Sequence, residues 1–173
     1  MTAPARPLAS EFNEYYAGYI AQVPEGDIVS VLRAQFVESV ALLERVTPEQ
    51  RAYRYAPGKW SLHEVVGHVV DMEWVFTVRA LSFARGLAAA MPGVEQDEFM
   101  AVANFAAQSW PDLLAQWRAL RNANTLLFSS FDEEAWKRKG IASGNPVSVR
   151  ALAYIVAGHE HHHMGVIRKR YLG

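Results

Sequence analysis

Apolar residues recur at every third or fourth position along most of the chain, which is the spacing of amphipathic helices. Four segments are long enough to be the helices of a bundle, and each starts at a residue that favours the N-cap position. They run from Asp27 to about Val46, from Ser61 to about Arg85, from Ser109 to about Phe128, and from Ser148 to Lys169. Four long helices with modest connections favour a single helical bundle.

The remaining segments are short, and we expect them to connect or cover the bundle. A short helix is predicted near residues 10–21, a helical turn at 47–50, a further helix near 97–107 and a brief restart at 129–134. Residues 53–59 and 139–146 are predicted to be loops, because Pro and Gly mark turns there. Residues 86–108 form a connection longer than a helical hairpin needs, so we expect it to cross over the bundle.

Length and composition are those of one globular domain. The chain has 173 residues, of which 51% are hydrophobic and 20% charged, so residues 1–173 are expected to form one all-α domain. The net charge of −1 disfavours nucleic acid as a partner. With no Cys, thiolate metal sites, disulfides and cysteine nucleophiles are excluded. We find no signal peptide and no apolar run that could span a membrane, so a cytoplasmic location is the expectation.

Two histidines of the last predicted helix stand where its pattern calls for apolar residues. The stripe reads Val149, Leu152, Val156, His159, His163, Val166 and Ile167. His159 and His163 are four positions apart, so both imidazoles lie on one helix face and can converge on one cation. His162 is rotated by about 60° from His159, and His161 points almost the opposite way and is expected to be solvated.

A third inward-facing histidine, His68, lies on the helix predicted to start at Ser61. Its apolar stripe consists of Val65, Val69, Met72 and Phe76. Glu64 and Asp71 lie one turn from His68, so either carboxylate could orient the imidazole or join the metal. A single inward histidine is more often a core residue, and the run from His159 to His163 could be a basic surface patch. Burying three imidazoles without a partner is costly, however, and this favours a metal site.

Two motifs resemble the DinB/YfiT-like family. The segment Lys59-Trp60-Ser61, followed by Glu64, His68, Asp71 and Arg79, is similar to the family pattern W-S-x-x-E-(apolar)-x-x-H-(apolar)-x-D. The run from Gly158 to His163 before Val166-Ile167 resembles the H-x-x-H-H of the family's last helix. Two features depart from the pattern: Val166 stands where the family has Gln, and His161 occupies a variable position.

This resemblance implies an up-down-down-up four-helix bundle with a divalent metal held by His68, His159 and His163. The family's metal is zinc or nickel, and water completes its ligand shell. Relatives include metal-dependent hydrolases and S-transferases or isomerases that use a low-molecular-weight thiol such as bacillithiol, mycothiol or glutathione. A homodimer is common among such proteins.

The resulting hypothesis is a metal-dependent enzyme that activates a thiol or water for a small-molecule substrate. Asp71, Glu64 or Glu160 would orient ligands or carry the proton, with Glu160 ranked below Asp71. Arg79 and Arg150 could hold an anionic substrate, although a solvated charge or an ion pair explains each one more simply. The alternatives are a non-catalytic metal- or small-molecule-binding module for stress response or regulation, and a structural helical dimer with incidental histidines.

Overall fold

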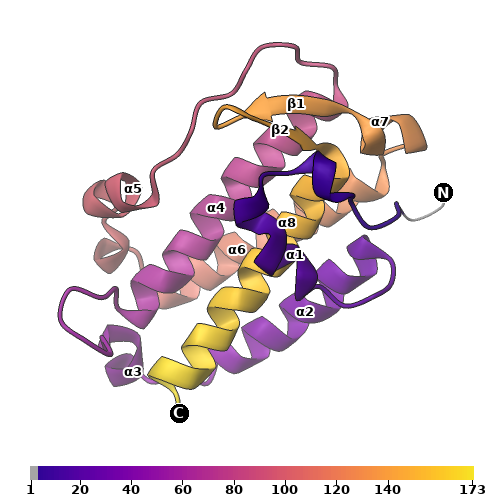
Figure 1. Cartoon of the computed structure of the whole chain (residues 1–173). Coiled ribbons are helices and arrows are strands. Elements are labelled where there is room, and N and C mark those ends of the chain that lie inside the picture. The colour runs from indigo at the N-terminus through magenta and orange to yellow at the C-terminus, as the bar shows by residue number, and fades with distance from the viewer. Residues whose placement is uncertain (1–3) are drawn as a thin grey trace.

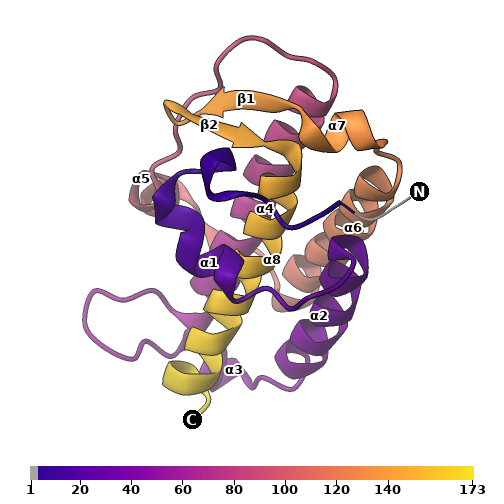
Figure 2. The same ribbon diagram turned by 45° about the vertical axis from the view of Figure 1, so that its right-hand side comes forward.

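The computed structural model describes residues 4–173, and its core is a bundle of four long helices. The expected all-α four-helix bundle is confirmed. Its helices are α2 (Ile28–Leu43), α4 (Leu62–Ala84), α6 (Trp110–Ser129) and α8 (Val149–Val166). Helices α2 and α8 run in one direction, and α4 and α6 run in the other, which is the up-down-down-up arrangement (Figures 1 and 2).

Local sequence explains where these helices begin. Ser61 and Glu64 form the predicted capping box of α4, and Ser148 accepts a hydrogen bond from the backbone of Ala151 at the start of α8. Gly86, at a φ of 83°, lies just beyond the end of α4, where only a residue without a Cβ is free of strain. The predicted ends of the long helices agree to within a few residues, and α8 continues as a π-helix over Ile167–Tyr171.

Helix α8 is the most buried element. Every residue from Ala151 to Glu160 is buried, because α2, α4 and the N-terminal segment all pack against it. Two apolar clusters form the core. One contains Met72 and Val156, and the other contains Val69 and Met164, so His68 and His159 lie where the clusters meet.

The N-terminal segment packs on α8, and the long connection packs on α4. The N-terminal segment holds 3-10 turns at Ala9–Glu11 and Glu14–Tyr16 and the short helix α1 (Ala17–Ala21), where one helix over 10–21 was predicted. The break has a local cause, because Asn13 accepts a hydrogen bond from the backbone of Tyr15 and starts a new turn. The connection crosses the bundle as predicted, carrying α5 (Gln96–Val102) and a 3-10 turn at Phe105–Ala107 (Figure 1).

One prediction was wrong, since residues 139–146 belong to a β-hairpin rather than a loop. Strand β1 (Lys139–Ala142) pairs antiparallel with β2 (Asn145–Ser148). The turn residues Ser143 and Gly144 both have positive φ, at 51° and 74°, as a type I′ turn requires. Four-residue strands are too short to display an alternating pattern, so the sequence signal was missed.

Three further short elements complete the description. These are α3 (Pro48–Ala52), α7 (Glu133–Lys137) and a single bridge between Met91 and Ala142 that ties the long connection to the hairpin. Across residues 4–173, no helix combines the length and apolar character needed to span a membrane.

Candidate metal centre

Three histidines from α4 and α8 meet in the middle of the bundle. The Nε2 atom of His159 lies 3.2 Å from that of His68 and 3.1 Å from that of His163. One ligating nitrogen from each residue falls within 4.8 Å of the other two. The i, i+4 spacing on α8 places two rings one above the other, and the antiparallel α4 supplies the third. The structure thus brings the three histidines singled out by sequence into one cluster.

Hydrogen bonding alone does not account for this cluster. The central Nε2, on His159, carries either one lone pair or one hydrogen, yet it has two ring nitrogens as neighbours. A divalent cation accepts the lone pairs of all three rings. Tetrahedral zinc with Zn–N bonds of about 2.0–2.1 Å places its ligand nitrogens about 3.3–3.4 Å apart, close to the observed spacings. The donor set therefore fits a divalent metal.

The protonation of the three rings also suits a metal. Burial lowers the pKa of His68 to about 4 and that of His163 to about 3. The pKa of His159 lies well below its ordinary value, because of burial and because of its histidine neighbours. Neutral imidazoles with free lone pairs are the form that binds metals.

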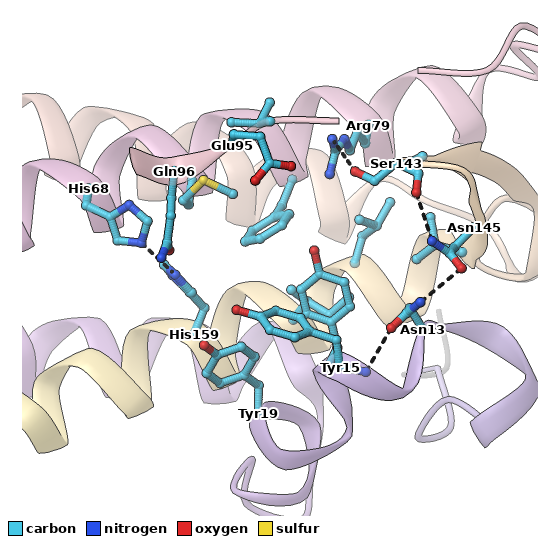
Figure 3. Close-up of a pocket in the computed structure, with 18 of the residues that line it drawn as sticks. Asn13, Tyr15, Tyr19, His68, Arg79, Glu95, Gln96, Ser143, Asn145 and His159 are labelled. Atoms are coloured by element: carbon cyan, nitrogen blue, oxygen red, sulfur yellow. Dashed lines mark hydrogen bonds between the residues drawn. The ribbon is translucent and has the colours of Figure 1, made fainter. Parts of the chain in front are cut away.

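A cavity of about 400 Å³ opens beside His68 and His159 (Figure 3). Its walls come from the N-terminal segment, α4, the start of α5, the β-hairpin and α8. A second hollow of about 440 Å³ lies on the side of His162 and His163, lined partly by Trp60. Gln96 and Asp97 line both. The histidine cluster can therefore be approached from two sides.

The tyrosines of the N-terminal segment were not anticipated as part of the site. The Tyr19 ring packs edge-on against His159 and His162, with ring centroids 5.8 and 5.1 Å apart. Gly158 allows this approach, because a Cβ at that position would lie 2.5 Å from the carbonyl carbon of Tyr19. The dense tyrosine run over residues 15–19 was the available sequence signal.

Gln96 and Asp97, at the start of α5, were also missed. In Figure 3 the Gln96 side chain extends towards His68 and His159. The charge of Asp97 favours the protonated form of His68 and so opposes part of the effect of burial on its pKa. Both are polar residues in a connecting segment, and nothing in their spacing distinguishes them from solvated loop residues.

The three carboxylates predicted to assist the metal lie in different surroundings. Glu64 completes the capping box of α4 and pairs with Arg54, so it is engaged at the helix end. Glu160 is buried on another side of α8, where it accepts a hydrogen bond from Ser39 and pairs with Arg121. Asp71 is half-buried, and burial raises its pKa, but it lines neither hollow beside the histidines.

The two candidate arginines differ sharply. Arg150 forms an ion pair with Glu11, with Nη2 and Oε2 2.7 Å apart. Its charge is therefore explained by a structural ion pair and not by substrate binding. Arg79 lines the 400 Å³ cavity and donates to the backbone carbonyl of Pro92. His161 is exposed, as expected.

Comparison with known proteins gives a consistent result. The family model described as the DinB superfamily matches residues 32–167. The fold is similar to YfiT from Bacillus subtilis, described as a probable metal-dependent hydrolase with an unusual four-helix bundle topology. That match has 18% identity and a TM-score of 0.68, and it covers 95% of this chain and 90% of YfiT. A DinB-like protein from Bacillus subtilis has 21% identity and a TM-score of 0.58 over 83% of this chain and 87% of its own. No curated protein matches the sequence.

Proposed function

Because this chain belongs to the DinB superfamily, we propose that it is a metal-dependent enzyme in which His68, His159 and His163 hold zinc or nickel. The reaction is the transfer of a thiol or the hydrolysis of a small-molecule substrate. The observation that carries the proposal is the convergence of three Nε2 atoms, from the buried His68 and His159 and the half-buried His163, at 3.1 and 3.2 Å beside a cavity. The description of YfiT as a metal-dependent hydrolase supports the hydrolytic version.

The chemistry that a divalent metal supplies at such a site is a lower pKa for a thiol or water, which makes the nucleophile available near neutral pH. The protein's own side chains fix the imidazoles. Trp60 packs on the ring of His68, and Phe76 and Tyr19 pack on the ring of His159. These aromatic contacts hold the nitrogens in place and limit the access of water.

Asp97 is the carboxylate that the proposal assigns to proton transfer. It lines both hollows and acts electrostatically on His68, whereas Glu64 and Glu160 are committed to other partners. A base at the meeting point of the hollows can take the proton of a thiol or water that enters from either side.

Metal analysis is the first test. Tag-free protein purified without added metal should contain about one zinc or nickel ion per chain, and His68→Ala should contain none, because two imidazoles are too few for a stable site. His161→Ala is the matched control and should keep the metal, since His161 is exposed on the same helix as His159. If wild type stays metal-free after reconstitution, or if both variants lose metal equally, the proposal fails.

Turnover separates catalysis from simple binding. Metal-loaded protein should accelerate the reaction of glutathione with chlorodinitrobenzene or the hydrolysis of nitrophenyl acetate, and Asp97→Asn should slow it without loss of metal. Metal binding with no turnover of thiol or ester substrates would instead favour a non-catalytic metal-binding module.

A further inference from the structure

Arg79 is a buried cation without a carboxylate partner. It is 4% exposed, and its Nη2 atom donates to the Pro92 carbonyl at 2.7 Å and to the Ser143 hydroxyl at 3.2 Å. Arg121 is as deeply buried, but it pairs with the carboxylates of Glu73 and Glu160. Within residues 4–173, no carboxylate oxygen lies within ion-pairing distance of Arg79.

Such a charge is expensive to keep inside a protein. Removing a guanidinium from water is strongly unfavourable unless an anion or a full set of hydrogen bonds replaces the lost hydration. Burial lowers the pKa of Arg79, while Tyr16 acts in the opposite direction. The neutral carbonyl and hydroxyl oxygens satisfy some of the donors but do not neutralise the charge. Because no carboxylate of the described chain pairs with Arg79, an anion that neutralises it would have to enter the cavity from outside.

The position of Arg79 shows where that anion would bind. Arg79 and the histidines His68 and His159 line the same cavity, with the arginine towards the hairpin end (Figure 3). Arg79 lies eleven positions after His68 on α4, which separates the two backbones by about 16 Å along the helix axis. The arginine side chain leans back towards the helix start, so an occupant that reaches both ends is shorter than this.

The remaining walls restrict the class of occupant. Between the two ends, α4 and α8 contribute an apolar wall that includes Met72, Phe76 and Leu152, and the N-terminal segment contributes three tyrosines and an asparagine. Two exposed acidic residues, Glu95 and Asp97, also line the cavity, and they disfavour multiply charged anions such as phosphate esters more than singly charged ones. A single arginine at one end of a cavity with an apolar and aromatic wall instead suits one negative charge on an aromatic body.

We propose that the substrate is a monocarboxylate, whose carboxylate pairs with Arg79 while its reacting group lies beside His68 and His159. The hairpin has a direct role, because its turn places the Ser143 hydroxyl against the guanidinium and fixes it for the ligand. The location of the reacting group rests on the function proposed above, whereas the carboxylate subsite is built from residues that do not depend on the metal.

The test uses a series of phenylalkanoates, from phenylacetate to phenylvalerate, each compared with its uncharged carboxamide. Binding is measured by ligand-observed NMR on the full chain, both metal-loaded and metal-free. At least one carboxylate should bind tenfold or more tightly than its amide. Arg79→Gln should remove this preference and Arg79→Lys should keep part of it. Arg118→Gln, which changes an exposed arginine paired with Glu44, should leave the preference intact.

The outcomes distinguish the subsite from the metal centre. If no acid of the series is preferred over its amide, or if the preference survives in Arg79→Gln, the subsite does not exist. If the preference persists without metal, the inference stands even when the metal analysis fails. Should Arg79→Gln not fold, the Nε–H resonance of Arg79 in wild type decides, since a bound carboxylate must shift it and an amide must not.

Discussion

Replacing Gly158 by alanine tests how closely the N-terminal helix α1 is packed over the histidine cluster. A Cβ on Gly158 would lie 2.5 Å from the carbonyl carbon of Tyr19 and closer still to its oxygen. Ordinary contacts begin near 3.4 Å, so α1 would have to move away from α8 by about 1 Å. Because the obstruction is backbone, no side-chain rotation can relieve it.

The same substitution at Gly165 provides the matched control. Gly165 lies on α8 as well, and nothing lies within 4 Å of where its Cβ would be. There, alanine should stabilise the protein by up to about 1 kcal/mol through its better helix propensity. At Gly158 that gain is opposed by an overpacking cost of about 1–3 kcal/mol.

Urea and thermal denaturation should therefore separate the two variants. We expect Gly158→Ala to be less stable than Gly165→Ala by about 1–3 kcal/mol, which corresponds to roughly 2–12 °C in Tm for a chain of this size. Tyr19 should also move away from His159, so the fluorescence of Tyr19 or the NMR chemical shifts of its ring should change only in the Gly158 variant. Equal stability of the two variants would refute the close packing of α1 on α8.

Two other perturbations address buried and pH-dependent charges. Arg121→Met leaves two buried carboxylates without their cation and should lower the free energy of unfolding, measured in urea, by about 3–5 kcal/mol. The control Arg118→Met, at an exposed ion pair, should lower it by at most about 1 kcal/mol. Similar losses in the two variants would contradict the burial of the Arg121 ion pairs. For Glu64, burial raises the pKa, but hydrogen bonds from Arg54 and the capping box outweigh it, so the net pKa is lowered. Its ionisation therefore stabilises the fold at pH values above the ordinary glutamate pKa of about 4.3. The higher Tm of wild type relative to Glu64→Gln should disappear as the pH falls below this value. A Tm difference that stays constant at all pH values would exclude a role for the charge.

Local sequence determined the helices and indicated which three histidines face inward. Caps such as Ser61 and Ser148 and the three-to-four-residue periodicity act within one or two turns of chain, so they can be interpreted without the fold. His159 and His163 were visible for the same reason, because they interrupt an apolar stripe whose direction is already fixed. His68 followed from an equivalent stripe on α4, and the DinB-like motifs pointed to the same three residues.

The surroundings of the histidines were decided only by tertiary structure. Asn13 donates to Asn145, which is 132 positions later, and such pairings leave no trace in local periodicity. The two candidate arginines also show that local sequence does not indicate long-range partners. In sequence, Arg79 and Arg150 are both single charges within helices, but folding brings Glu11 to Arg150 from 139 positions away and brings no carboxylate to Arg79 within the described chain. A charge becomes a binding group or a structural one according to the partners that distant segments supply, and this depends on the packing of the whole bundle.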